Sequence, residues 1–254
     1  MLRPRIIPCL LIHKGGLYKT QQFGAPKYVG DPLNAVRIFN EKQVDEIMVI
    51  DIDASRKGVA PDLRLIKHLA AECRMPLCYG GGVKTVQQVE DLISLGVEKV
   101  SLGSAAALSP DVLTQAARRV GSQSVVGVVD YKRTGLFKRP EAVILNGTRK
   151  IGRDPVTLAR ALEDAGVGEI LLNSVDRDGT MEGYDLEMID RIMEAIGVPL
   201  TVLGGAGTLE HLESVVRKYP QIGVAAGSMF VFRGKFRAVL INYPDQDQRK
   251  RLCG

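Results

Sequence analysis

Eight short apolar runs recur along the chain, and most are followed by a segment in which apolar residues have helical spacing. The runs cover residues 6–12, 46–53, 76–80, 99–103, 124–130, 169–175, 199–205 and 223–228. Their hydrophobicity is continuous, which is typical of parallel strands covered on both faces. The segments 32–44, 60–73, 85–96, 109–121, 154–166, 185–197 and 208–219 have the pattern of amphipathic helices, and several end in glycine.

Eight strands alternating with helices predict an α/β fold of the (β/α)8 TIM-barrel class. The length of 254 residues agrees with about 250 residues for such a barrel. We therefore expect one domain over residues 1–254, with half-barrels at about 1–121 and 122–240 and a solvated C-terminal tail, 241–254. Segments 13–32 and 132–153 are too long for simple turns, and long loops after strands usually belong to function.

Two stretches repeat the order strand, glycine pair, helix, strand and Gly-Ser. Gly80 precedes Gly103 by 23 residues, and Gly204 precedes Gly227 by the same number, which suggests a duplicated half. Glycine turns let the backbone approach a ligand closely, and N–H groups at helix starts attract anions. The predicted phosphate sites are formed by Gly81, Gly82, Gly103 and Ser104 in the first half, and by Gly204, Gly205, Gly227 and Ser228 in the second. A phosphorylated small molecule with a phosphate at each end would suit them.

Chemistry in such barrels takes place at the carboxyl ends of the strands. The polar residues at these ends include Asp51 and Asp130, and Asn173 with Asp176. We expect Asp51 to be a structural hydrogen-bond acceptor or an organiser of a phosphate-binding loop. Asp130 has two interpretations, a carboxylate bonded to loop backbone or a general acid–base group.

Bulk composition excludes several classes of function. The net charge of +5 fits a solvated surface or attraction of phosphorylated substrates, and without basic blocks interleaved with aromatics it predicts no nucleic-acid partner. No apolar window of about 20 residues predicts a membrane span, and the N-terminal apolar run is too short for a signal peptide. Cys9, Cys73, Cys78 and Cys253 lack CxxC spacing, which indicates reduced thiols in a cytoplasmic protein. No metal or cofactor motif is present.

Several stretches resemble the cyclase subunit family of imidazole glycerol phosphate synthase. They are RIIPCLLIHKG (5–15), DIDAS (51–55), VVDYKR (128–133), EILLNSVDRDGTMEGYDLEMI (169–189) and LGGAGTLEHL (203–212). The resemblance implies that a separate glutaminase subunit docks on the N-terminal face of the barrel and supplies ammonia. In the family, ammonia crosses the barrel to a phosphoribulosyl-formimino nucleotide, which is split and cyclised to imidazole glycerol phosphate and AICAR ribotide. The chain has three histidines and no cysteine in a nucleophile context, so a glutaminase has to be a partner.

The resemblance also assigns an ammonia gate. Arg5, Glu46, Lys99 and Glu169 each stand at the start of an apolar strand and match the family's gate positions. Two positive and two negative groups can close a neutral ring of ion pairs, as buried charges require. The alternative is a structural salt-bridge cluster that seals the barrel floor. Lys19 matches a substrate-binding position, and we expect Asp176 to bind substrate as well.

One position departs from the family. Its cyclisation uses two aspartates as general acid and base, at the ends of the first and fifth strands; Asp130 fills the second position and Leu11 stands at the first. Leucine has no exchangeable proton, and loss of such a group typically costs ~10²- to 10⁴-fold in rate. His13 and Asp53 are the candidates to replace it. Asp53 stands where the histidine enzyme usually carries a small hydroxyl residue, and we expect it to repel an anion.

This combination resembles second-copy cyclase-like subunits encoded with surface-polysaccharide genes. There the glutaminase–barrel pair is thought to feed ammonia to a separate sugar amidotransferase, which forms an acetamidino group on an N-acetylated sugar of lipopolysaccharide or O-antigen. The first alternative is a working cyclase of histidine biosynthesis in which another group replaces Leu11. The second is a non-catalytic partner or phosphate-ligand-binding barrel.

Overall fold

The computed structural model describes residues 3–253, except for the side chain of Cys253. The strands are β1 (Arg5–His13), β2 (Gly16–Lys19), β3 (Lys27–Gly30), β4 (Ile47–Asp51), β5 (Leu77–Gly80), β6 (Lys99–Leu102), β7 (Val125–Thr134), β8 (Arg139–Ile144), β9 (Arg149–Lys150), β10 (Glu169–Ser174), β11 (Leu200–Leu203), β12 (Gly223–Ala226), β13 (Phe232–Arg233) and β14 (Ala238–Val239). The α-helices are α1 (Pro32–Glu41), α2 (Ala54–Lys57), α3 (Leu63–Glu72), α4 (Val86–Ser94), α5 (Ser104–Leu108), α6 (Asp111–Val120), α7 (Pro155–Asp164), α8 (Leu186–Met193), α9 (Leu209–Val216), α10 (Ser228–Val231) and α11 (Gln246–Cys253); a 3₁₀ turn, η1, covers Ser122–Ser124.

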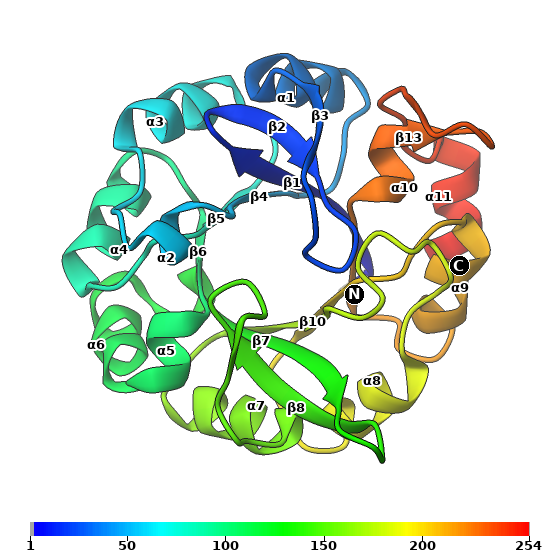
Figure 1. Ribbon diagram of the computed structural model, residues 1–254. Coiled ribbons are helices and arrows are strands. Elements are labelled where there is room, and N and C mark those ends of the chain that lie inside the picture. Colours follow the sequence, from blue (N-terminus) through cyan, green and yellow to red (C-terminus); the bar gives the residue numbers. More distant parts are fainter. Residues whose placement is uncertain (1–2, 254) are drawn as a thin grey trace.

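Eight parallel strands close into a barrel. The hydrogen-bonded order is β1, β4, β5, β6, β7, β10, β11 and β12, and β12 pairs back to β1. Figure 1 looks along the barrel axis and shows the helices as an outer ring. The predicted (β/α)8 barrel is confirmed. The observed strands agree with the predicted runs to within two residues at each end, except for β7, which continues to Thr134.

The outer helices begin where the sequence provides caps. The Asp31 side chain accepts a hydrogen bond from the backbone N–H of Asn34 at 2.8 Å, and Pro32 opens α1. Asp154 and Pro155 do the same for α7, and Thr85 forms a capping box at α4. These groups satisfy N–H donors that have no partner within the helix. The apolar face of each helix then packs against the outside of the barrel.

The two long segments after the first and fifth strands are β-hairpins, not irregular loops. β2 pairs antiparallel with both β1 and β3, and β7 pairs with β8, which is followed by β9. A third hairpin, β13–β14, follows α10. All three hairpins follow barrel strands at their carboxyl ends, so they surround the same end of the barrel (Figure 1).

The C-terminal segment corrects an expectation. A solvated tail was expected, but α11 packs beside α9 and Leu252 is buried. Arg249 Nη1 donates a hydrogen bond to the carbonyl oxygen of Gln43 at 3.0 Å, and its guanidinium lies over the ring of Tyr243. Leu252, which follows the basic residues, anchors the segment, although Lys250 and Arg251 remain exposed.

Strand alternation divides the core in two. In β1, Ile6, Leu10 and Ile12 belong to the cluster between barrel and helices, whereas Ile7 and Cys9 belong to the cluster inside the barrel. Successive strand side chains point to opposite faces, so every second residue of β1 points along the interior. Within residues 3–253, no helix combines the length and apolar character that a membrane crossing requires.

Candidate functional site

The barrel interior has three levels, a charged floor, an apolar middle and a polar cavity. Arg5 occupies the floor on β1, Ile7 the middle, and Cys9 and Leu11 the cavity. The period of two along the strand produces this order, because these residues share one face. The neighbouring strands contribute side chains to the same three levels.

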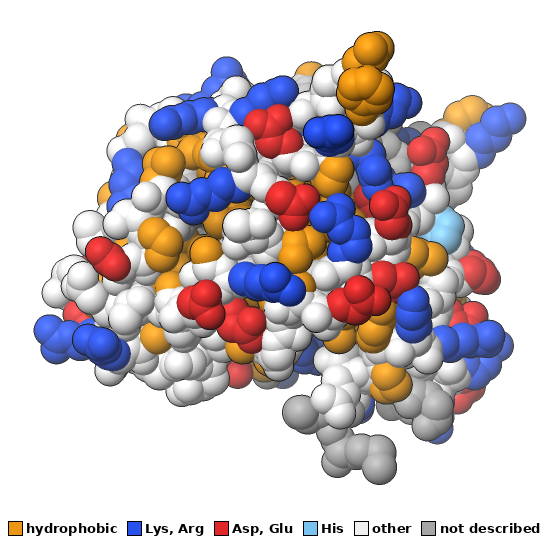
Figure 2. Space-filling view, turned by 90° about the horizontal axis from the view of Figure 1, so that it is seen from below, with side chains coloured by type: hydrophobic (Ala, Val, Ile, Leu, Met, Phe, Trp, Pro, Cys, Tyr) orange, Lys and Arg blue, Asp and Glu red, His pale blue; other side chains and the backbone are white. Residues whose placement is uncertain are grey.

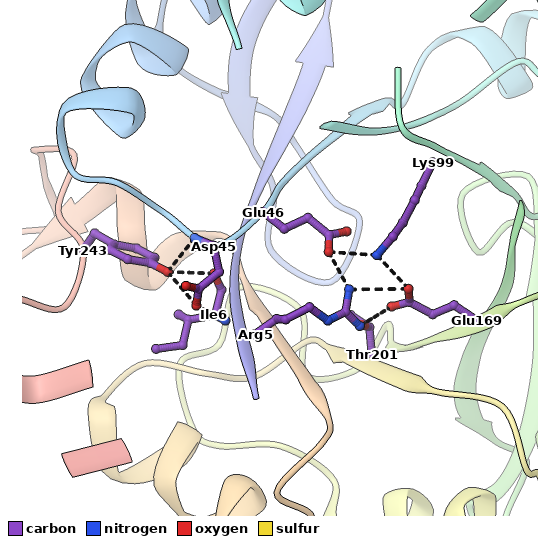
Figure 3. A network of polar contacts seen from close by, with 8 residues as sticks. All are labelled: Arg5, Ile6, Asp45, Glu46, Lys99, Glu169, Thr201 and Tyr243. Atoms are coloured by element: carbon purple, nitrogen blue, oxygen red, sulfur yellow. Dashed lines mark hydrogen bonds and ion pairs between the residues drawn. The ribbon is translucent and has the colours of Figure 1, made fainter. Parts of the chain in front are cut away.

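The floor is a ring of ion pairs. Arg5 Nη1 donates to Glu46, and Arg5 Nη2 donates to Glu169 Oε1 at 2.7 Å. Lys99 Nζ donates to one oxygen of Glu46 and to one of Glu169, each at 2.9 Å (Figure 3). Each carboxylate therefore contacts both cations. The structure brings together the four residues predicted for the gate, and it adds Thr201, whose hydroxyl donates to Glu169 Oε1 at 2.5 Å.

The charges of the ring stabilise one another. Burial lowers the pKa of Arg5 and of Lys99, but the carboxylates of Glu169 and Glu46 outweigh it and raise both pKa values. Burial raises the pKa of Glu169, but Arg5 and Lys99 outweigh it and hold that pKa below its ordinary value. The formal charges of the ring sum to zero, and this mutual attraction offsets part of the cost of burying them.

The middle level is apolar. It consists of Ile7, Met48, Cys78, Val126, Leu171 and Ala225, all of them buried. Burial raises the pKa of the Cys9 thiol to about 11 and that of Cys78 well above its ordinary value, so both thiols are neutral. Cys9, Cys73 and Cys78 are free thiols, as expected, whereas the side chain of Cys253 lies outside the described residues.

A cavity of about 210 Å³ lies above this layer, at the carboxyl ends of the strands. The predicted site residues that line it are Lys19, Asp51, Gly81, Gly103, Ser104 and Asp130. Leu11, His13 and Asp53 line the same cavity. Two loops contribute to its wall, the β2–β3 loop through Phe23 and the β8–β9 turn through Asn146 and Thr148.

Asp130 is placed for proton transfer. It faces inward from β7, and Asn173 Nδ2 donates to its Oδ1 at 2.9 Å. Burial raises the pKa of Asp130 to about 6, against the opposing effect of Asn173. A carboxyl group with a pKa close to the working pH can both accept and release a proton. Leu11, on the same cavity, offers no second group.

The charge of Asp53, which we expect to repel an anion, is partly balanced by its neighbours. Its carboxylate contacts His13 Nδ1 at 2.7 Å and Lys57 Nζ at 2.8 Å, and accepts from the N–H of Lys14. Burial opposes ionisation, but these hydrogen bonds outweigh it and lower the pKa of Asp53 to about 2. Asp51 is a structural acceptor, as expected; it accepts from the N–H of Asp53 at 2.8 Å.

The first-half turn depends on glycine. Gly81 has a φ of 107°, and a Cβ there would overlap the carbonyl oxygen of Asp51. Gly82 belongs to this turn but does not line the cavity, since its N–H donates to Ser55 Oγ at 3.1 Å. The backbone of this turn therefore reaches the cavity at Gly81. Gly103 and Ser104 line the adjacent part of the cavity wall.

The second-half turns differ from the expectation of an open phosphate site. Gly204, Gly205, Gly227 and Ser228 do not line the cavity. Lys19 Nζ lies against Gly227, where a Cβ would overlap it, and donates to the carbonyl oxygen of Cys9 at 2.5 Å. Arg237, from the β13–β14 hairpin, places Nη2 3.5 Å from Ser228 Oγ and 3.0 Å from the carbonyl oxygen of Gly179. These two basic side chains therefore lie at the Gly227–Ser228 turn.

A family model described as "Histidine biosynthesis protein" matches residues 5–237. The chain belongs to this family. It is 54% identical over 252 residues to "Putative imidazole glycerol phosphate synthase subunit HisF" of Leptospira interrogans, with 99% of each chain covered. It is 51% identical over 245 residues to "Putative imidazole glycerol phosphate synthase subunit hisF2" of Pseudomonas aeruginosa, covering 96% of this chain and 97% of that one. It is 39% identical over 230 residues to "Imidazole glycerol phosphate synthase subunit HisF" of Alkaliphilus metalliredigens, covering 91% of each.

In this member of the family, Asp178 rather than Asp176 lies on the cavity. The Asp176 carboxylate accepts from the N–H of Arg133 at 2.6 Å and holds the turn after β10. Asp178 accepts from Thr20 Oγ1 at 3.1 Å; burial raises its pKa, and Lys19 opposes this. The sequence DRDG offers two aspartates, and only the path of the turn decides which one faces the cavity.

Other cavity residues have no local signal in the sequence. Asn146 reaches the site from the β8–β9 turn, where its Nδ2 donates to the carbonyl oxygen of Ile52. Phe23 reaches it from the β2–β3 loop. Thr201 resembles any buried strand residue, and its bond to Glu169 depends on the closure of the barrel. Among residues 3–253 no group of three or more His, Cys, Asp or Glu side chains could hold a metal ion.

Proposed function

We propose that this chain is the ammonia-receiving barrel of a glutaminase–barrel pair that serves a separate sugar amidotransferase. That enzyme would form an acetamidino group on an N-acetylated sugar of a surface polysaccharide such as lipopolysaccharide. The observation that carries the proposal is a contrast within one interior: the charged ring at the floor is complete, whereas Leu11 leaves Asp130 without a second acid–base group.

The floor has the properties of a gate. Because Glu46 and Glu169 each contact both Arg5 and Lys99, withdrawal of Lys99 leaves each carboxylate with Arg5 as a partner. The ring can open there without leaving an unpaired carboxylate. Beyond it, the apolar middle level favours neutral ammonia over ammonium, because a charge in an apolar environment is strongly penalised. A glutaminase on the floor would therefore deliver ammonia to the cavity.

The cavity is poorly equipped to complete the cyclisation itself. Removal of one positioned proton-transfer group typically lowers the rate by ~10²- to 10⁴-fold. Gly204, Gly205, Gly227 and Ser228, which form the turns that a second phosphate would use, also do not line the cavity. Delivery of ammonia requires neither the missing carboxyl group nor a second phosphate site that opens into the cavity.

A specific observation favours a second candidate, a working cyclase of histidine biosynthesis. His13 lies on the same cavity as Asp130 and contacts Asp53 at 2.7 Å. Histidine is the residue that most often serves as a general acid or base, so His13 with Asp53 is the structural candidate to replace the absent carboxyl group.

Complementation separates the two candidates. A strain that lacks its histidine-pathway cyclase is transformed with this gene or with its own cyclase gene, and growth without histidine is measured. We expect growth only with the control gene; growth with this gene would contradict the proposal. In parallel, the glutaminase encoded nearest to this gene is mixed with the purified barrel, and glutamine hydrolysis is followed. Stimulation is expected, and its absence would favour a non-catalytic barrel.

A further inference from the structure

The charge of the chain is concentrated around the cavity mouth. The three hairpin segments 14–31, 132–153 and 232–240 contain 13 lysines and arginines but only 2 aspartates and glutamates, a net charge of +11. The whole chain carries +5, so the remaining residues carry −6. The first two segments line the cavity, and the third reaches Ser228 through Arg237. The three hairpins at the end of the barrel opposite the floor are therefore strongly positive.

Most of this charge is not neutralised within the barrel. Arg133 pairs with Asp185 and Glu187, and Lys150 with Glu141. In the part of the chain that the structure describes, no carboxylate pairs with the exposed side chains of Lys27, Lys138, Arg139, Arg233 and Lys235. Such groups lie outside the cavity, so binding of a small substrate within it leaves them in water.

Large apolar side chains stand among these charges. Leu136 and Phe137, in the turn between β7 and β8, are 92% and 79% exposed, and Phe236, in the turn between β13 and β14, is 91% exposed. Tyr28 on β3 is 57% exposed. In the side view of Figure 2, hydrophobic side chains project from the upper edge of the molecule. Exposed aromatic side chains are enriched on surfaces that bind proteins.

We infer that the three hairpins form a docking surface for the enzyme that consumes the ammonia, and that the facing surface of this partner is acidic with apolar pockets. The inference rests on the proposed function, because ammonia that leaves an open mouth is protonated and lost in water. A receiving enzyme has to seal the mouth, and the hairpins lie around it on different sides (Figure 1). Opposite charge would steer the partner, and the tips would fill its pockets.

The alternatives fit these observations less well. A small phosphorylated substrate would be held inside the cavity, and Leu136, Phe137 and Phe236 do not line it. Single-stranded nucleic acid needs aromatic faces on which bases stack along a groove. Here the tips combine aromatic rings with aliphatic Leu136 and belong to separate hairpins.

The test measures binding of the barrel, in complex with its glutaminase, to the recombinant sugar amidotransferase from the same organism. Substitutions Phe137→Ser and Phe236→Ser are each expected to weaken binding by about tenfold or more. Combining Lys138→Glu with Arg139→Glu is expected to slow association about tenfold and to flatten its dependence on salt. Two matched controls, Ile38→Ser on α1 and Lys67→Glu on α3, lie on the outer helices and should leave the Kd unchanged.

Stimulation of the glutaminase shows that each variant is folded, because that subunit is expected at the opposite end. An equal Kd for the tip variants and the controls would overturn the docking surface. A second result would also overturn it: the amidotransferase does not bind, whereas a single-stranded oligonucleotide binds at physiological salt and the tip substitutions weaken that binding. If the amidotransferase binds through the tips but no acetamidino product forms, the docking surface stands and the proposed function fails.

Discussion

The hydroxyl group of Tyr243 donates a hydrogen bond to the carbonyl oxygen of Ile6 at 2.9 Å, and thereby ties the C-terminal segment to the barrel floor. The same hydroxyl accepts from the N–H of Asp45 at 3.2 Å, and the Asp45 carboxylate accepts from the N–H of Ile6 at 3.0 Å (Figure 3). Ile6 and Asp45 are the chain neighbours of Arg5 and Glu46. One tyrosine therefore fixes the backbone that carries two members of the floor ring.

Removal of this hydroxyl should destabilise the barrel. Tyr243→Phe leaves the partly buried N–H of Asp45 and the carbonyl oxygen of Ile6 each without one partner, and we expect a loss of about 1–3 kcal/mol in the free energy of unfolding by urea. Tyr219→Phe is the matched control: that hydroxyl donates to the partly exposed Asp190 at 2.7 Å, and water can replace it. Equal losses of stability for both variants would show that the Tyr243 hydroxyl does not stabilise the barrel floor more than a surface hydroxyl stabilises its own region.

Neutralisation of one carboxylate in the ring should cost more at neutral pH than in acid. Glu169→Gln leaves Arg5 and Lys99 undercompensated, and loss of one partner of a buried ion pair typically costs about 3–5 kcal/mol. Since the folded-state pKa of Glu169 is lowered, its contribution is present above the unfolded-state pKa and is lost as pH falls through the folded-state value. The difference from wild type should therefore shrink on acidification. Glu213→Gln, in a surface pair with Arg217, is the control and should cost about 0.5 kcal/mol or less.

The raised pKa of Asp130 gives the opposite dependence on pH. Burial raises the pKa from 3.8 to about 6, so the ionised carboxylate destabilises the folded state. Wild type should lose up to about 3 kcal/mol relative to Asp130→Asn as pH rises from about 4 to 6. Asparagine can still accept the hydrogen bond from Asn173. Urea unfolding of both proteins across this range tests the prediction, and a constant difference would show that Asp130 has an ordinary pKa.

Restoration of the second carboxyl group should restore cyclisation. Leu11 and Asp130 line one cavity, and Leu11→Asp is expected to raise turnover of the phosphoribulosyl-formimino nucleotide with added ammonium salt by ~10²- to 10⁴-fold. The control is Leu11→Asn, which has similar polarity but cannot serve as an acid or base. Equal turnover for the two variants would mean that the cavity has diverged more widely than at one position.

The sequence by itself determined the architecture. Continuous apolar runs separated by amphipathic segments are typical of parallel strands with helices packed outside them. Eight such runs in a chain of this length predict a closed barrel. The period of two along β1 also fixed the order of Arg5, Cys9 and Leu11 from floor to mouth. Position along the strands also predicted that Arg5, Glu46, Lys99 and Glu169 lie at one end of the barrel, where they form the ring of ion pairs.

Only the tertiary structure decided what the loops and the tail contribute. Three features depend on the paths of non-repetitive backbone: the choice of Asp178 over Asp176, the entry of Asn146 into the cavity, and the positions of Lys19 and Arg237 at the Gly227–Ser228 turn. Tyr243 meets Ile6 across 237 positions of sequence. Local periodicity carries no information about such contacts, because they form only when the barrel closes and brings distant segments together.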